Sequence, residues 1–307
     1  MFKVLSIVVT HNGEKWLDKC FRSLCISNFK TDVYCIDNHS SDRTIELIKE
    51  NYPLVMVKSL NENIGFGMAN NLGLLYAREN NYDYVFLLNQ DAWVETNTLS
   101  ELVNVSNTYK NYGVLSPIHL NGTGDRLDLK FSQYIGERHC SNYYSDLLLK
   151  KDINKVYSLP FVNAAAWLVT KSVLNNIGGF DPLFSHYGED ENFCQRLIYH
   201  GYSIGIVPNS VIYHDRPQKL DFFDKYKDLY FFERVMKVTI ANVNNKNFDI
   251  VFQKEISRIN SFIYASIITL DFNNFRRWRA YSVLLKKIMK SLKKSYLSNV
   301  LSGSNYI

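Results

Sequence analysis

The side chains best placed for acid–base chemistry form one run, Glu189-Asp190-Glu191, which is the densest acidic cluster in the 307-residue chain. A carboxylate in such a run could act as a general base and take the proton of an attacking hydroxyl. Clustered like charges raise the pKa of one member, which favours that role. Acidic residues also stabilise the N-terminus of a helix through its dipole, so the cluster has a structural explanation beside the catalytic one.

Four apolar segments in the first 91 residues are each followed by polar residues. These are Thr10-His11-Asn12-Gly13, the run from Asp37 to Asp42, the run from Asn61 to Gly67, and Asn89-Gln90-Asp91. Asp37 could accept a hydrogen bond from the N–H of a nucleotide base, and a turn carboxylate is the alternative. Asp42 is fully explained as a helix N-cap.

The run Asn63-Ile64-Gly65-Phe66-Gly67 is a glycine-rich turn ahead of a predicted helix. The backbone N–H groups of such a turn can bind a phosphate. It is not a dinucleotide-binding fingerprint, because Asn70 occupies the place of the third glycine and the run follows the third strand. A nicotinamide-dependent oxidoreductase is therefore disfavoured, and a plain tight turn remains the alternative for Gly67.

The apolar segments that precede these polar runs are typical of strands buried on both faces. We predict strands at 4–9, 33–36, 54–57 and 84–88, and helices at 14–25, 41–50 and 69–79. This alternation predicts a parallel sheet that gathers the polar runs at the carboxyl ends of its strands. Further along, we predict helices at 99–110, 171–177 and 192–200, a strand at 202–207 ending at Pro208, a variable loop region at 120–150, and mainly helices after about 218.

The net charge of +5 is unevenly distributed. Residues 271–307 hold eight Lys and Arg and one Asp, whereas the other 270 residues have a net charge of −2. This argues against a body that binds nucleic acid through general positive charge. On a helical wheel, the segment from Trp278 to Tyr296 has an apolar arc opposite its Lys and Arg residues. Two interpretations stay open: packing on the body, or docking on anionic lipid.

Five cysteines, an odd number without a C-x-x-C pair, favour a reducing compartment. No signal peptide is predicted at the N-terminus. The longest later apolar stretch, 262–270, is too short to span a bilayer. We therefore expect a cytoplasmic protein.

Six motifs occur in a characteristic order and carry a family resemblance. They are Ser6–Asn12, Ile36–Asp42, Asn63–Gly67, Leu87–Asp91, Gly178–Asp181 and Tyr187–Asp190. Together they resemble the family-two inverting glycosyltransferases, most closely the bacterial rhamnosyltransferases, over roughly residues 3–215. The resemblance implies an α/β, Rossmann-like GT-A domain for nucleotide-diphospho-sugars at 1–217, with a C-terminal helical region at 218–307.

The resemblance also implies roles for individual residues. Asp37 would hold a uracil or thymine ring, and the residues lining the same nucleotide site would be Thr10, Asn12, Asp42, Asn63, Gly65, Phe66, Asn89 and Gln90. The position of the family's Asp-x-Asp metal motif is occupied by 89–91. Asp91 would therefore be the carboxylate ligand of Mg²⁺ or Mn²⁺, and His214 would complete the shell.

For the chemistry itself, the resemblance makes Asp190 the general base and Glu189 a supporting residue, and Arg196 could neutralise the cluster or a phosphate. The favoured reaction moves L-rhamnose from dTDP-L-rhamnose to a hydroxyl of a cell-surface polysaccharide or lipid-linked glycan. UDP-hexose or UDP-galactofuranose transfer, and a catalytically silent glycan-binding or scaffolding homologue, are the alternatives. The expected partners include an anionic membrane surface at the inner face of the plasma membrane and a second copy of the chain, but no nucleic acid.

Overall fold

The chain folds around one mixed sheet of nine strands in the computed structural model, which describes residues 2–185, 187–219 and 228–307. The order is β3-β2-β1-β4-β8-β6-β9-β5, and β7 pairs with β9 beside this path. The strands are β1 (Val4–Thr10), β2 (Asp32–Asp37), β3 (Met56–Ser59), β4 (Tyr84–Asn89), β5 (Ala92–Val94), β6 (Tyr112–Asn121), β7 (Tyr157–Ser158), β8 (Ala166–Thr170) and β9 (Ser203–His214). The first four are parallel, whereas β8 is antiparallel to β4 and β6.

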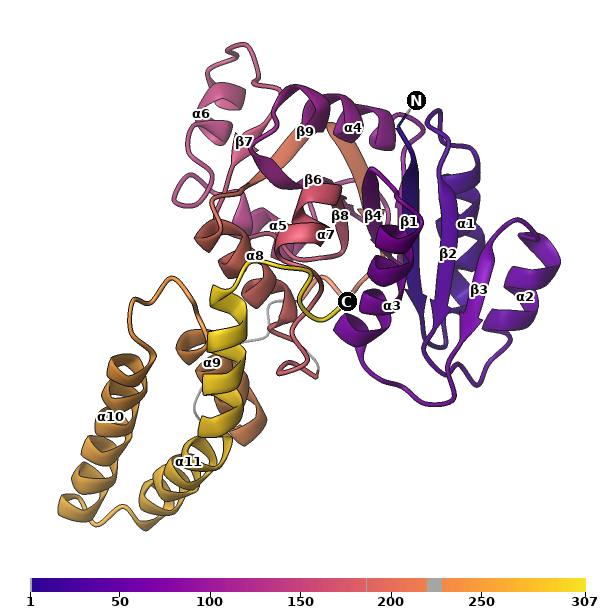
Figure 1. Cartoon of the computed structure of the whole chain (residues 1–307). Coiled ribbons are helices and arrows are strands. Elements are labelled where there is room, and N and C mark those ends of the chain that lie inside the picture. The colour runs from indigo at the N-terminus through magenta and orange to yellow at the C-terminus, as the bar shows by residue number, and fades with distance from the viewer. Residues whose placement is uncertain (1, 186, 220–227) are drawn as a thin grey trace.

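Helices cover both faces of this sheet, and a three-helix bundle lies beside it (Figure 1). The helices are α1 (Leu17–Cys25), α2 (Thr44–Asn51), α3 (Phe66–Glu79), α4 (Thr98–Thr108), α5 (Leu129–Tyr134), α6 (Tyr143–Leu148), α7 (Lys171–Asn176), α8 (Glu189–Tyr199), α9 (Leu229–Ile240), α10 (Phe248–Ile268) and α11 (Phe272–Val300), with a 3₁₀ turn at Glu14–Trp16. The last three form the bundle.

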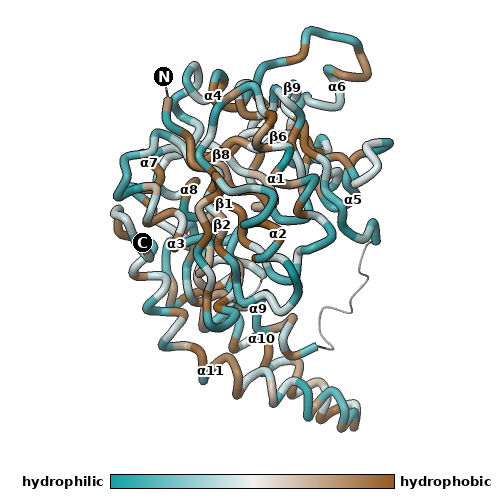
Figure 2. Tube along the Cα trace, turned by 90° about the vertical axis from the view of Figure 1, so that its right-hand side faces the viewer, coloured by the Kyte–Doolittle hydropathy of each residue, from teal (hydrophilic) through white to brown (hydrophobic). Residues whose placement is uncertain are grey.

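Strand β1 shows why the sheet needs helices on both sides. Its side chains alternate between the faces, and each face carries buried apolar side chains. Val4 and Val8 pack in the core formed with α1, α2 and α4, whereas Leu5 and Ile7 pack in the core formed with α3, α7 and α8. Figure 2 shows the same pattern as brown strands at the centre of the molecule, with teal loops around them.

The predicted N-terminal strands and helices are confirmed, with three shifts in position. The helix predicted at 41–50 begins at Thr44 as α2, and the helix predicted at 69–79 begins at Phe66 as α3. The third strand, β3, lies two residues later than predicted, and Leu54 is 94% exposed in the turn before it. The carboxyl ends of β1, β2, β3 and β4 lie at one edge of the parallel half of the sheet. The polar runs that follow these strands are therefore neighbours, as predicted.

The strand predicted to end at Pro208 instead continues to His214 as β9, so this prediction was wrong. The pairing of β9 with β6 is irregular at the prolines: Pro117 pairs with Val207, but Ile118 pairs with Val211. Proline cannot donate a ladder hydrogen bond and is tolerated at such a bulge. Because of this bulge, β9 continues beyond Pro208 as one strand, and its last residue, His214, lies at the site.

Residues 120–150, predicted as a variable loop region, contain the short helices α5 and α6. Asp128 caps α5 by accepting a hydrogen bond from the backbone N–H of Phe131 at 2.8 Å. The cap turns the chain after β6 so that the start of α5 lies next to the end of β9.

The basic amphipathic segment predicted at 278–296 lies within α11, and its apolar arc packs inside the helical bundle. The rings of Tyr281 and Phe232 stack with centroids 4.0 Å apart, and Leu285 and Leu292 are fully buried. The packing interpretation of the apolar arc is therefore confirmed, and most of the lysines opposite it stay exposed. Among the described residues, no helix has the length and apolar character needed to cross a membrane.

The bundle is fastened to the sheet domain by Asp181, which follows the Gly178-Gly179 turn. Its buried carboxylate accepts hydrogen bonds from Ser295 (2.5 Å), Asn299 (2.8 Å) and Tyr306 (3.2 Å). Gly178 has a φ of +81°, and a Cβ there would lie 1.9 Å from the carbonyl oxygen of Asn305. The predicted boundary between 217 and 218 stays a prediction, since the side chain of Gln218 bonds the sheet domain through Asp128.

Replacing Asp181 by alanine is expected to destabilise the protein by about 3 kcal/mol, because three donors on the bundle side lose a buried charged acceptor. Urea unfolding of the full chain measures this loss. Asp249→Ala is the matched control, since the Asp249–Lys293 ion pair is exposed and should contribute less than about 1 kcal/mol. Equal midpoints for the two variants would contradict the anchoring role of Asp181.

Candidate active site

One end of the site is formed where β1 and β2 end side by side. Asp37 is 2% exposed, and its carboxylate accepts hydrogen bonds from Thr10 Oγ1 at 2.9 Å and from Ser40 Oγ and N at 2.5 and 3.0 Å. These three bonds fix the carboxylate and leave room for one further donor on Oδ2. Thr10 and Asp37 therefore lie together, as predicted.

The loops after β1 and β2 are tied to each other by side chains. Asn12 has a φ of +49°, and its Oδ1 accepts a hydrogen bond from the backbone N–H of Ser41 at 2.8 Å. Asp42 accepts from the N–H of Thr44 at the start of α2 and from the N–H of Glu14. Asp42 therefore binds the first N–H of α2 from one residue before the N-cap position, which Arg43 occupies. Its role is structural, as the sequence indicated, but it is not the N-cap.

The glycine-rich turn lies between the loop after β2 and the acidic cluster. Asn38, which was not predicted as a site residue, donates to Asn63 Oδ1 at 2.8 Å and accepts from the N–H of Ile64. A Cβ on Gly65 would lie 2.4 Å from the carbonyl oxygen of Ser185, and one on Gly67 would contact Phe180 and Glu189. These glycines permit the close approach of the segment that carries the acids.

Residues 89–91 divide their tasks. Gln90 accepts from the N–H of His11 at 2.9 Å and donates to its carbonyl at 3.1 Å, so its side chain fixes the β1 loop. Asn89 Oδ1 is buried and has no hydrogen-bond partner among the described residues. Asn89 therefore keeps an unused buried acceptor two residues before Asp91 in the sequence.

Phe66, which was also predicted as a site residue, packs edge-on against Phe180 in the core.

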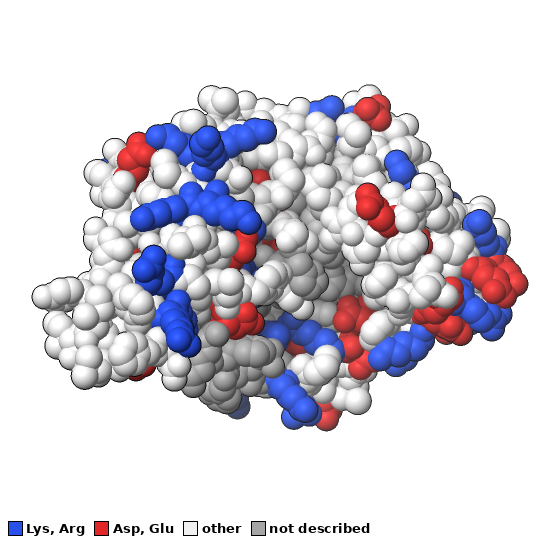
Figure 3. Space-filling view, turned by 90° about the horizontal axis from the view of Figure 1, so that it is seen from below, with Lys and Arg blue, Asp and Glu red and all other residues white. Residues whose placement is uncertain are grey.

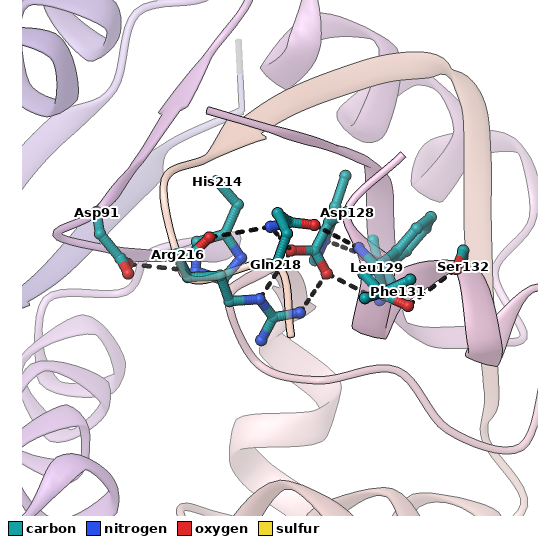
Figure 4. Close-up of polar contacts among 10 residues, drawn as sticks. Asp91, Asp128, Leu129, Phe131, Ser132, His214, Arg216 and Gln218 are labelled. Atoms are coloured by element: carbon teal, nitrogen blue, oxygen red, sulfur yellow. Dashed lines mark hydrogen bonds and ion pairs between the residues drawn. The ribbon is translucent and has the colours of Figure 1, made fainter. Parts of the chain in front are cut away.

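Asp91 and His214 meet at the end of β9. Asp91 Oδ1 lies 3.3 Å from His214 Nε2 (Figure 4), and the backbone N–H of Asp215 donates to the carbonyl of Asp91. Among the described residues, no three His, Cys, Asp or Glu side chains could hold a metal on their own. The pair, with the unpartnered Asn89 oxygen nearby in sequence, fits a hard cation whose other ligands are phosphates and waters.

A buried ion pair supports this end of the site. Asp128 forms a two-point contact with Arg216 and also accepts from Gln218 at 3.0 Å (Figure 4). Burial raises the pKa of Asp128, but the hydrogen bonds from Arg216 and Gln218 outweigh it and hold that pKa well below its usual range. His119 stacks on Phe131 and is also fully buried, which holds its pKa well below the ordinary value.

The acidic cluster forms the first turn of α8, three residues before the predicted start. Burial raises the pKa of Glu189 to about 7, and the neighbouring Asp190 adds to this. Burial also raises the pKa of Asp190, although its Oδ1 accepts the N–H of Glu191 at 2.9 Å. Glu189 Oε2 is buried without a partner in the described part of the chain. Burial raises the pKa of Glu191 too, and three carboxylates with raised pKa values at one place are typical of acid–base sites.

Tyr134 connects the two ends of the site. Its pKa is raised to about 12, first by burial and then by the charge of Asp190, while Arg216 lowers it. The Tyr134 ring packs edge-on against Phe161. The charges of both the acidic cluster and the Arg216–Asp128 pair therefore act on Tyr134, which was not predicted from the sequence.

Arg196, suggested as a neutralising residue, is occupied elsewhere. Its guanidinium is fully buried and donates to Asn192 and to the carbonyls of Ile177 and Gly179. Arg196 therefore holds the turn before Asp181 in place, and the suggestion that Arg196 contacts a phosphate was wrong. Arg234 on α9, in the helical bundle, instead supplies positive charge that lowers the pKa values of Glu189, Asp190 and Glu191.

Replacing Arg234 by methionine is expected to move the acid limb of the pH–rate profile to higher pH. Loss of the nearby positive charge raises the pKa of Asp190, so the deprotonated base appears only at higher pH. The rate on the alkaline plateau should change little. The profile of kcat/KM between pH 5 and 9 measures the shift, and Arg234→Lys is the control that keeps the charge. An unmoved acid limb in the methionine variant would contradict this coupling.

Comparisons with known proteins agree with this geometry. The model of glycosyl transferase family 2 matches residues 6–178. N-acetylglucosaminyl-diphospho-decaprenol L-rhamnosyltransferase of Mycobacterium tuberculosis is 22% identical over 240 residues, which cover 70% of this chain and 77% of the relative.

Solved structures support the fold. S. aureus TarS 1–349 in complex with UDP-GlcNAc has a TM-score of 0.58 at 15% identity, covering 97% of this chain and 89% of that one. GalNAc-T7 with UDP, GalNAc and Mn²⁺ has a TM-score of 0.57 at 17% identity; the match covers 78% of this chain and 48%, about half, of GalNAc-T7. Because the family match spans more than half of its residues, the chain belongs to glycosyl transferase family 2.

Proposed function

We propose that this glycosyltransferase moves a sugar from a nucleoside diphosphate to an acceptor hydroxyl with inversion at the anomeric carbon. The observation that carries the proposal is the pairing of Asp190, a partly accessible carboxylate with a raised pKa, with Glu189 in the first turn of α8. A base there can take the acceptor proton while the hydroxyl oxygen attacks opposite the leaving group.

At the other end of the site, the proposal assigns Asp37, with Thr10 and Asn12, to the nucleotide base, and the turn carrying Asn63 and Gly65 to the nucleotide's border. Asp91 and His214 would hold Mg²⁺ or Mn²⁺. Such a cation, when bound, neutralises charge that builds on a departing diphosphate. GalNAc-T7 in complex with UDP and Mn²⁺ supports this assignment by fold alone.

The favoured donor is dTDP-L-rhamnose and the favoured acceptor is a lipid-linked glycan or a growing cell-surface polysaccharide. The mycobacterial relative, whose name gives L-rhamnosyl transfer and a diphospho-decaprenol acceptor, supports the sugar and the lipid-linked acceptor. UDP-hexoses and UDP-galactofuranose are the second candidates, because TarS binds UDP-GlcNAc on the same fold. We place the enzyme in the cytoplasm, at the inner face of the plasma membrane.

A donor panel with Mn²⁺ tests the proposal, using product mass for the sugar and NMR of the anomeric proton for inversion. Rhamnose transfer from dTDP-L-rhamnose is expected, and transfer only from UDP-sugars would move the assignment to the second candidates. No hydrolysis or transfer of any donor, together with no thermal shift from UDP or dTDP, would favour a catalytically silent homologue.

A further inference from the structure

The α10–α11 hairpin ends in a tip that is almost free of charge. Residues 259–275 contain a single charged side chain, Asp271, and that carboxylate caps α11 by accepting the N–H of Asn274 at 3.0 Å. The exposed apolar and aromatic residues of this hairpin tip, with exposed fractions of 52–73%, are Tyr264, Ile267, Ile268, Leu270 and Phe272. More than half of the surface of each of these five residues is therefore left uncovered by the helical bundle.

Leu270 occupies a backbone position that does not suit leucine. Its φ is +53°, in the left-handed region where glycine or asparagine is usual after a helix. The N–H of Asp271 bonds the carbonyl of Ser266 at 2.9 Å, which closes the C-terminus of α10. The chain therefore presents a strained leucine, 73% exposed, where glycine would fit the turn better. Most of the residue is exposed and adds little packing to the fold, which points to a use outside the fold.

Positively charged side chains follow the hairpin tip along α11. Phe272, Arg276 and Arg279 are spaced at i, i+4 and i+7 and so share one face of α11, and both arginines are exposed. Neither forms an ion pair with a residue that the structure describes. Further along the same helix lie the exposed Lys286, Lys287 and Lys290. At the left of Figure 3 the hairpin shows a white, uncharged surface with Lys and Arg side chains beside it.

We propose that the hairpin tip docks on an anionic lipid bilayer, with Ile268, Leu270 and Phe272 entering the interface and Arg276 and Arg279 contacting the headgroups. A protruding apolar end bordered by cations suits a lipid surface. A second copy of the chain fits less well, because a two-fold contact at the tip would bring the arginines of both copies together. The evidence for docking does not depend on the proposed reaction. Only the biological use of docking rests on the proposed function, in which the acceptor is lipid-linked.

Docking by the hairpin tip differs from the docking by the amphipathic segment 278–296 that the sequence suggested. The apolar arc of 278–296 is buried in the bundle and is not available to lipid. Deleting 276–307 would also remove Tyr281 and Leu285 from the bundle core and the bonds to Asp181, so such a deletion cannot separate docking from folding. Substitutions at the exposed tip leave those contacts in place.

The test is sedimentation of the full chain with vesicles of phosphatidylglycerol and phosphatidylcholine in equal parts, without donor or acceptor. The triple variant Ile268→Ser, Leu270→Gly, Phe272→Ser is expected to bind at least about tenfold more weakly. Glycine suits the backbone at 270, so the thermal midpoint should not fall. Leu54→Ser with Ile250→Ser removes exposed apolar side chains elsewhere and should bind like the wild type. Because no turnover is measured, the result is independent of the proposed reaction.

Arg276→Gln with Arg279→Gln should reduce binding to these vesicles, while the weak binding to pure phosphatidylcholine stays unchanged. Equal binding by the tip variant and the wild type would overturn the proposal. So would a wild type that does not bind anionic vesicles. A wild-type dimer without lipid that becomes monomeric in the tip variant, seen by sedimentation velocity, would assign the tip to a second copy instead.

Discussion

Replacing Asp190 by asparagine is expected to lower the rate of sugar transfer by roughly 10²- to 10⁴-fold, the usual contribution of a general base. The amide keeps the size of the side chain and can still accept the N–H of Glu191, so α8 should begin as before. It cannot take a proton from the acceptor hydroxyl. Donor affinity, measured by calorimetry with the nucleotide, should stay close to that of the wild type, because the residues proposed to bind the nucleotide base, Thr10, Asn12 and Asp37, follow other strands.

Glu189→Gln is the matched control for that experiment. Burial raises the pKa of Glu189 to about 7, so its carboxyl holds a proton at higher pH than an ordinary glutamate, and a neutral amide resembles the protonated form. We expect a much smaller loss of rate than in Asp190→Asn. Full activity in Asp190→Asn combined with an inactive Glu189→Gln would give the role of base to Glu189 and contradict the assignment.

The N-terminal half of the site could be predicted because its positions depend on local sequence. Short apolar strands followed by polar runs fix which residues lie at the carboxyl edge of a parallel sheet. Thr10 and Asp37 lie together for that reason. The pattern did not show that Gln90 and Asn12 would use their side chains to bond neighbouring loops, because those partners depend on side-chain geometry across strands.

The other half of the site depends on contacts between distant segments. Arg216 and Asp128 are 88 residues apart, and Arg234 reaches the acidic cluster from the helical bundle. No periodicity or spacing joins such residues. Strand β9 was also predicted too short, because Pro208 usually ends a strand and the bulge that accommodates it is visible only in the pairing with β6.

Replacing Asp91 by alanine is expected to weaken metal-dependent donor binding and to lower transfer by about 10²-fold, because in the proposed assignment the cation that stabilises the leaving diphosphate loses its single carboxylate ligand. The fold should survive. The backbone bond from the N–H of Asp215 to the carbonyl of Asp91 remains in the variant, and the removed side chain is partly exposed. Calorimetry of UDP or dTDP binding over a series of Mn²⁺ concentrations separates loss of the metal from loss of the nucleotide.

Asp215→Asn is the control, since this neighbouring carboxylate accepts a hydrogen bond from Trp16 Nε1 at 2.9 Å and is not assigned to the metal. It removes one negative charge from the same end of β9, so it matches the general electrostatic change of Asp91→Ala. If Asp91 binds the cation, only Asp91→Ala should raise the Mn²⁺ concentration needed for half-maximal transfer. Equal Mn²⁺ dependence in both variants and the wild type would mean that the Asp91–His214 contact is structural and that the diphosphate is neutralised by other groups.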